Sequence, residues 1–193
     1  MPFNRRRFLE SCSLASAAVL TSGFVIPAAE SADPVVRNGA AKFKFSLAAY
    51  SYRNLLSGKS PQLTLGDFID DCAKMQLEGT ELTSYYFPNP VTPEYLRQLK
   101  QRCFRLGLDV SGTAVGNDFG HLPGEQRDKQ IAHMKRWIDY AEILGAPVIR
   151  VFAGQVQKDS TPQEAHKLMV TALEECCDYA GQHGTYLALE NHG

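Results

Sequence analysis

The chain has 193 residues, of which 44% are hydrophobic, enough to fill one sizeable core in a single domain. Its 20 Lys and Arg nearly balance 21 Asp and Glu, which leaves a formal net charge of -1. Domains that bind nucleic acid normally present a basic surface, so this composition argues against a nucleic-acid partner.

The N-terminal segment, residues 1–31, resembles a twin-arginine export signal. Arg5 and Arg6 form the basic pair, and residues 11–27 are a mildly apolar run rich in Ala, Ser and Val. This run is too short and too polar for a transmembrane helix, so no stable membrane insertion is expected. The alternative is a frayed basic tail. Residues 32–42 are typical of a linker, and the signal predicts export to the periplasm.

From residue 43 onward, strand-like segments alternate with segments whose apolar residues recur at helical spacing. In chain order, the predicted elements are a strand at 43–50, a helix at 65–73, a strand at 80–83, a helix at 93–106, a strand at 108–114, a helix at 125–144, a strand at 147–152, a helix at 162–183 and a strand at 185–190. Because strands that alternate with helices pair in parallel, this order predicts an α/β protein with one parallel sheet.

The predicted helices carry start and stop signals. Thr92 followed by Pro93 is typical of a helix N-terminus, and Thr161 with Glu164 forms a capping box. Three helices are expected to end at a glycine, which adopts the left-handed cap conformation with little strain: Gly107, Gly145 and Gly184. Their regular spacing indicates a repeated strand–helix unit.

Two architectures contain such repeats. In an open doubly wound sheet, the ligand-binding loop usually comes after the first strand and is rich in glycine, but residues 49–58 lack a phosphate-binding motif. A complete (β/α)8 barrel built of units of about 36 residues would need on the order of 290 residues, roughly twice the length of the chain after the linker. The sequence therefore predicts an incomplete TIM barrel, about (βα)4β, spanning residues 43–193. Its unpaired sheet edge predicts homo-oligomerisation or aggregation.

Three segments carry a resemblance to a known family. Residues 111–119 (SGTAVGNDF), 137–154 (WIDYAEILGAPVIRVFAG) and 189–193 (LENHG) resemble the sugar phosphate isomerase/epimerase superfamily of xylose isomerase-like TIM barrels. The resemblance covers residues 43–193. It implies a small carbohydrate substrate and metal-assisted proton transfer next to a carbonyl group.

The resemblance also implies a divalent metal ion: Mn, Mg, Co or Zn. Family members hold it with Glu, Asp, His and Glu at the ends of four strands in the second half of the barrel. Glu190 matches the first of these ligands, and the other three would lie beyond Gly193. The expectation is a truncated family member that does not retain the metal ion.

Four residues are the candidates for the site. Glu190 ends the last predicted strand, where barrel enzymes place their chemistry, and is assigned the roles of metal ligand and catalytic base. Glu81 and His192 are candidate substrate-binding residues, although Glu81 could equally anchor a loop. Arg150 interrupts an apolar strand, so its charge needs a partner, which could be a substrate oxygen, Glu81 or Glu190.

Aromatic residues come after the first two predicted strands, and they could either line a sugar pocket or pack in the core: Tyr50, Tyr52, Tyr85, Tyr86 and Phe87. Two other functions compete with a sugar isomerase or epimerase. One is an inactive fragment or a non-catalytic carbohydrate-binding module. The other, an enzyme like endonuclease IV, is disfavoured by the export signal and the acidic balance, because that enzyme needs several zinc-binding histidines and a basic groove.

Overall fold

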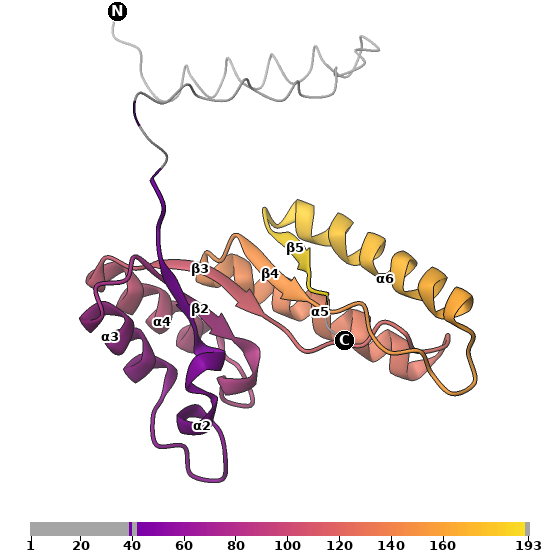
Figure 1. Ribbon diagram of the computed structural model, residues 1–193, viewed down its shortest axis with the longest axis horizontal. Coiled ribbons are helices and arrows are strands. Elements are labelled where there is room, and N and C mark those ends of the chain that lie inside the picture. The colour runs from indigo at the N-terminus through magenta and orange to yellow at the C-terminus, as the bar shows by residue number, and fades with distance from the viewer. Residues whose placement is uncertain (1–38, 40–41, 192–193) are drawn as a thin grey trace, which may run out of the picture. The chain divides into compact units, whose positions relative to one another are not determined.

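The computed structural model describes residue 39 and residues 42–191. The expected export signal, most of the linker and His192 therefore lie outside the described residues. Five strands form one sheet: β1 (Ser46–Ala48), β2 (Gly79–Thr83), β3 (Asp109–Ala114), β4 (Val148–Val151) and β5 (Tyr186–Leu189). Figure 1 shows them as arrows, with the helices packed alongside.

Four helices alternate with the strands: α3 (Leu65–Lys74), α4 (Pro93–Leu106), α5 (Glu125–Leu144) and α6 (Pro162–Gln182). A short 3-10 turn (Ala49–Tyr52) and α2 (Arg53–Leu56) come after β1, and a second 3-10 turn (Ser84–Tyr86) comes after β2. None of the helices within residues 42–191 combines the length and the apolar character needed to cross a membrane.

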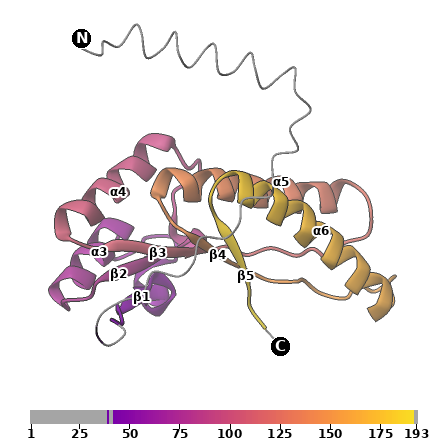
Figure 2. The ribbon, with the colours of Figure 1, turned by 90° about the horizontal axis from the view of Figure 1, so that it is seen from above.

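The topology of the sheet distinguishes the two predicted architectures. The strands lie in sequence order, β1-β2-β3-β4-β5, and each pairs with its neighbour in parallel. Right-handed crossovers that always step in one direction place every helix on the same face, whereas a doubly wound sheet reverses direction at a switch point. Figure 2 shows α4, α5 and α6 on one side of the strands. The fold is therefore the partial TIM barrel that the sequence predicts.

The hydrophobic core lies between the strands and the helices. Leu82, Ile149 and Val151 point from β2 and β4 toward the helices and are fully buried. Since side chains alternate along a strand, Glu81 and Arg150 point to the opposite face, which is the interior of a barrel. The face that carries no helices is thus polar at the positions where the candidate site residues lie.

The helix caps confirm the local sequence signals at α4, at the end of α5 and at the start of α6, whereas α6 ends at Gln182 with His183 (φ -99°), not Gly184, as its cap. Thr161 and Glu164 form a capping box at α6, and the Thr92 hydroxyl accepts the Tyr95 amide hydrogen at α4 (3.2 Å). Gly107 and Gly145 end α4 and α5 with φ of 72° and 77°. With left-handed caps of this kind, two residues separate α4 from β3 and three separate α5 from β4.

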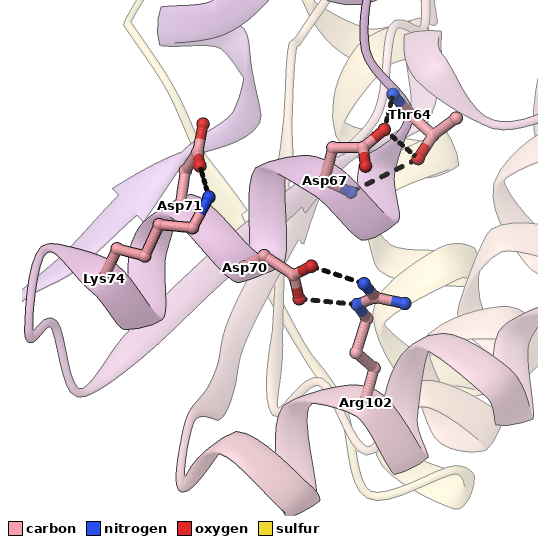
Figure 3. Close-up of polar contacts among 6 residues, drawn as sticks. All are labelled: Thr64, Asp67, Asp70, Asp71, Lys74 and Arg102. Carbon is pink, nitrogen blue, oxygen red and sulfur yellow. Dashed lines mark hydrogen bonds and ion pairs between the residues drawn. The ribbon is translucent and has the colours of Figure 1, made fainter.

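Figure 3 shows how α3 begins and how it is joined to α4. Thr64 and Asp67 form a capping box that is not among the caps predicted from the sequence. Asp70 of α3 accepts a bidentate pair of hydrogen bonds from Arg102 of α4. These contacts lie on the outer helices and stabilise the scaffold rather than the strand ends.

The first strand is shorter than the predicted segment 43–50. Its pairing with β2 begins at Ser46, which lies opposite Gly79. The Phe45 carbonyl oxygen accepts the amide hydrogens of Glu78 and Gly79, at the start of this pairing. After Ala48 the chain turns into the 3-10 helix. The apolar residues Phe43 and Phe45 therefore lie outside the sheet and are mostly exposed.

Both outer strands have one unpaired edge within residues 42–191, since β1 pairs only with β2 and β5 only with β4. Tyr186 on β5 is 77% exposed beside such an edge. We predict that the 193-residue chain self-associates at micromolar concentration, because an exposed strand edge with an apolar side chain is a template for further pairing. Light scattering after gel filtration measures the mass.

The substitution Tyr186→Lys is expected to shift the chain toward monomer, because a lysine on an edge strand opposes edge-to-edge pairing. Phe104→Lys is the matched control, since Phe104 is 83% exposed on α4, on the outer helical layer. Equal shifts in both variants would show that association is not through the sheet edge.

Candidate functional site at the carboxyl ends of the strands

A cleft of about 570 Å³ opens where β4 and β5 end. It is lined by Asn117, Phe152, Ala153, Gly154, Gln155, Leu189, Glu190 and Asn191. Parallel barrels place their chemistry at this end of the sheet, because the loops after the strands converge there. A second hollow of about 480 Å³ lies around Asp70 and Arg102 on the outer helices, away from all strand ends.

An ion pair between neighbouring strands is the centre of the site. Arg150 Nε lies 3.0 Å from Glu190 Oε2. The register explains the contact: Arg150 pairs with Ala188, and Glu190, the residue directly after β5, lies two residues further along on the same side of the chain. The Glu190 amide continues the ladder by donating to the Val151 carbonyl (2.9 Å). Of the partners considered for Arg150 from the sequence, the structure shows this pairing with Glu190.

Arg150 makes two further contacts. Its Nη1 donates to the Val115 carbonyl oxygen (3.2 Å), and its guanidinium carbon lies 4.1 Å from the centroid of the Phe152 ring. A cation over an aromatic face is attracted by the ring's negative charge density. Arg150 therefore contacts Glu190, the Val115 carbonyl and the Phe152 ring, and its side chain is only 20% exposed.

Glu81 lies deeper on the same face, near the pair. Burial raises the pKa of the Glu81 carboxyl, the Arg150 charge lowers it, and the Glu190 charge raises it. Burial has the largest effect because a half-buried carboxylate loses hydration that the nearby guanidinium, already bound to Glu190, does not restore. The structure thus brings Glu81, Arg150 and Glu190 into one electrostatic cluster.

A stability prediction arises from Glu81. A carboxyl whose pKa is raised on folding stabilises the protein fully below its unfolded-state pKa, and this stabilisation is lost as pH rises through the folded-state value. We therefore expect Glu81→Gln to increase the free energy of unfolding at pH 7 by on the order of 1 kcal/mol or less, since solvent screens a partly exposed group. The difference should vanish below about pH 4.

Urea unfolding of both proteins at pH 4 and pH 7 measures this difference. Glu174→Gln is the matched control, because Glu174 is an exposed carboxylate on the outer surface of α6. A destabilised Glu81→Gln variant at pH 7 would show instead that the Glu81 charge supports the fold.

Two further polar residues, Asn117 and Asp118, join the loop after β3 to the loop after β4. Asn117 Nδ2 donates to the Phe152 carbonyl oxygen (2.6 Å), and its Oδ1 accepts the Phe152 amide hydrogen (2.9 Å). Asp118 Oδ1 accepts the amide hydrogens of Gly120 and Gln155 (both 2.9 Å). We call Asn117 and Asp118 the loop latch, because they fix the rim of the cleft through main-chain atoms.

The loop latch requires glycine at position 154. Gly154 has φ of +123°, a conformation that side-chain-bearing residues rarely adopt. A Cβ atom there would lie 2.7 Å from the amide nitrogens of Phe119 and Gly120 and would also meet Asp118 Oδ1. The latch residues are not among those chosen from the sequence. Their position directly after a predicted strand, inside the segment 111–119, is the signal that could have found them.

The aromatic residues divide between two roles. Tyr50 and Tyr85, at the ends of β1 and β2, are about half exposed and meet edge to face at 6.5 Å between ring centroids. Tyr52 instead packs on Phe68, and Phe87 packs on Trp137. Of the two alternatives that the sequence leaves open, core packing applies to Tyr52 and Phe87, whereas Tyr50 and Tyr85 form an exposed pair at the strand ends.

Within the described part of the chain, no three His, Cys, Asp or Glu side chains come together as a metal-binding group. His192, a candidate from the sequence, lies outside that part. Glu190 and Glu81 both interact with the Arg150 guanidinium, Glu190 through an ion pair and Glu81 through its charge. The donor atoms of residues 42–191 do not by themselves fit a complete divalent-metal site.

Comparison with known proteins assigns the fold to a family. Residues 69–193, more than half of the chain, match the xylose isomerase-like TIM barrel family. No match was found among curated proteins. Among solved structures, a xylose isomerase domain protein from Planctomyces limnophilus is similar with a TM-score of 0.51 and 22% identity, covering 64% of this chain and 48% of that one.

The names of two other similar structures describe two different reactions, an epimerisation and a dehydration. D-psicose 3-epimerase from Clostridium cellulolyticum H10 matches with a TM-score of 0.62 and 15% identity over 76% of this chain and 52% of that one. A probable 3-DHS dehydratase from Bacillus anthracis matches with a TM-score of 0.57 and 21% identity over 78% and 53%. These likenesses show a shared fold, and the chain spans about half the length of each structure. The chain belongs to the xylose isomerase-like TIM barrel family.

Proposed function

We propose that this chain carries part of the active site of a carbohydrate isomerase or epimerase. The observation that supports the proposal is the Arg150–Glu190 pair, 3.0 Å apart in a cleft at the carboxyl ends of β4 and β5. Sugar epimerases occur among proteins with this fold, such as D-psicose 3-epimerase and L-ribulose 3-epimerase. Glu190 is the proposed catalytic base.

The proposed reaction is proton transfer at the carbon next to a carbonyl. Glu190 takes the proton from that carbon, and the electrons of the C–H bond move toward the carbonyl oxygen to form an enolate. Arg150 places positive charge beside the cleft, where it stabilises the developing negative oxygen. Return of a proton to the carbon completes the reaction, and its direction of return decides whether the configuration inverts. Glu81 and His192 are proposed to bind substrate hydroxyl groups.

A divalent metal ion is implied by the family resemblance. In a metal-containing barrel Glu190 would supply one ligand, and the ion would polarise the substrate oxygens. In the present structure Glu190 Oε2 is bound to Arg150, and the described carboxylates do not assemble a full ligand set. The roles proposed here for residues of this chain are those of Glu190 as base and Arg150 as positive charge beside it.

Deuterium exchange tests the proposal. The purified chain is incubated with D-fructose in D2O, and NMR monitors deuterium entering the carbon next to the carbonyl. We expect slow incorporation above the rate without protein. If a folded protein gives no incorporation but still binds fructose, the non-catalytic carbohydrate-binding alternative replaces the enzyme. If it does neither, the inactive-fragment alternative holds.

We also propose that the protein is exported by the twin-arginine route, as residues 1–31 suggest. The double substitution of Arg5 and Arg6 by Lys is expected to retain the precursor in the cytoplasm, because the receptor of this route reads the arginine pair. Fractionation of periplasm and cytoplasm measures the distribution. Arg7→Lys is the control, and equal export of both variants would contradict the proposed route.

A further inference from the structure

We infer that Arg127 is a positioning residue, which fixes the rim of the cleft from the helical side by joining it to α6. The inference rests on the proposed function for its effect on the reaction, whereas its effect on the rim is a property of the fold and is measured separately. Three observations carry it: the burial of Arg127, the two carbonyl oxygens that its guanidinium contacts, and the close packing of the loop after β3.

Arg127 lies in the first turn of α5 and is only 9% exposed. Burial removes water from its charge, and the N-terminal end of a helix carries positive partial charge, so both effects oppose a cation there. Glu125 and Asp128 are the acidic residues of the same turn, but within residues 42–191 Glu125 pairs with Lys129 (2.6 Å) and no carboxylate pairs with Arg127. The hydrogen bonds of the guanidinium must therefore offset the cost of burial, and they show what Arg127 connects.

The guanidinium bridges two segments that are far apart in the sequence. Its Nη1 donates to the Phe119 carbonyl oxygen (3.1 Å), in the loop after β3, and its Nη2 donates to the Leu168 carbonyl oxygen (2.8 Å), in α6. Because Arg127 itself belongs to α5, one side chain joins three segments. A planar guanidinium has its N–H groups in fixed directions, so the two acceptors are held in a defined geometry relative to each other.

The loop that Arg127 contacts also supports the rim of the cleft. The Phe119 amide donates to the carbonyl oxygen of Ala153 (3.1 Å), which lines the cleft, and the Phe119 side chain is fully buried. Asp118, directly before Phe119, belongs to the loop latch and accepts the Gln155 amide hydrogen. A shift of the Phe119 peptide would therefore disturb two of the main-chain contacts that hold the loop after β4.

The loop after β3 is closely packed on both sides. A Cβ atom at Gly120 would lie 1.9 Å from the Gln155 carbonyl oxygen and 2.8 Å from Met169 Cε, which belongs to α6. Gln130 of α5 accepts the Asp118 amide hydrogen (3.0 Å). Because the loop lies this close to both the other rim loop and α6, a displacement of the loop relative to α6 is transmitted to the cleft.

The test measures amide hydrogen exchange by NMR in the full chain and in Arg127→Met. Methionine keeps much of the volume of the side chain but removes its charge and all of its N–H donors. We expect the amides of Phe119, Gly120 and Gln155, which form the hydrogen bonds of the rim, to exchange at least about tenfold faster in the variant. The amides of β2 and β3 serve as the reference and should accelerate less.

Two other variants complete the experiment. Arg136→Met is the matched control, because Arg136 is an exposed arginine of the same helix, and it should leave the exchange of the rim amides unchanged. If Arg127→Met does not fold, Arg127→Lys takes its place. Lysine keeps the buried charge, but its single ammonium group cannot reproduce the fixed fork of the guanidinium, so the rim amides should still exchange about threefold faster than in the wild type.

A second readout concerns the reaction. We expect folded Arg127→Met to incorporate deuterium into D-fructose about tenfold more slowly than the wild type, because a displaced rim misplaces the ligand relative to Glu190. The full rate in a variant with a loosened rim would overturn the positioning role.

The inference and the proposed function fail by different results. Equal acceleration of the rim amides and the β2 and β3 amides would show that Arg127 supports only the stability of the whole domain, and it would overturn the inference. Unchanged rim amides would overturn it as well. The proposed function fails instead if the wild-type chain gives no deuterium incorporation, and the exchange of the rim amides then still decides whether Arg127 positions the rim.

Discussion

Replacing Glu190 by glutamine should lower the rate of deuterium incorporation into D-fructose by about 100-fold or more, since general base catalysis contributes this much and an amide cannot accept the proton. Glutamine keeps the size of the side chain. The cleft should therefore keep its shape, and fructose binding should change little compared with the loss of exchange. NMR measures both quantities on the same sample.

Two comparisons sharpen this experiment. Glu174→Gln makes the same chemical change on the outer surface of α6 and should retain the wild-type rate. Near-ultraviolet circular dichroism shows whether Glu190→Gln remains folded despite the loss of the contact with Arg150. Retention of the full exchange rate in folded Glu190→Gln would remove Glu190 from the mechanism.

Gly154→Ala is expected to destabilise the protein by about 3 kcal/mol or more, because it adds backbone strain to a steric conflict. The new methyl group would press on the amide nitrogens of Phe119 and Gly120, which belong to the backbone and cannot rotate away. Relief of the conflict would break the hydrogen bonds of Asp118 to the rim. Urea unfolding gives the free energy, and fructose binding should weaken in parallel.

The matched control for this substitution is Gly181→Ala. Gly181 lies in α6, and a Cβ atom there meets no atom within 4 Å. Alanine favours a helix over glycine by about 1 kcal/mol, so this variant should be as stable as the wild type or slightly more so. If Gly154→Ala were equally stable, the rim would not depend on the conformation that Gly154 adopts.

The partial barrel could be predicted from the sequence because its signals are local and repeated. Helical spacing, threonine caps and the glycines at 107 and 145 each fix one element without knowledge of the rest, and the structure confirms them. The exception is the first strand. Its length depends on where β2 supplies a partner, and this is a property of two segments more than thirty residues apart.

The site was harder to predict from the sequence. Glu190 stands out because it ends an apolar segment, and Arg150 stands out because it interrupts an apolar strand. The sequence left the partner of Arg150 open, since only the register of β4 against β5 decides between Glu81 and Glu190. The loop latch was missed for a related reason. Asn117 bonds to the backbone of Phe152, and such a contact leaves no periodic pattern in either segment.

The loop latch has a consequence for how this family member could change during evolution. Asn117 and Asp118 form hydrogen bonds with main-chain atoms of Phe152 and Gln155. These bonds do not depend on which side chain occupies position 155. Substitutions at position 155 would therefore change the lining of the cleft without removing these main-chain contacts. The composition of the cleft wall can thereby vary one residue at a time while the two loops keep their hydrogen bonds.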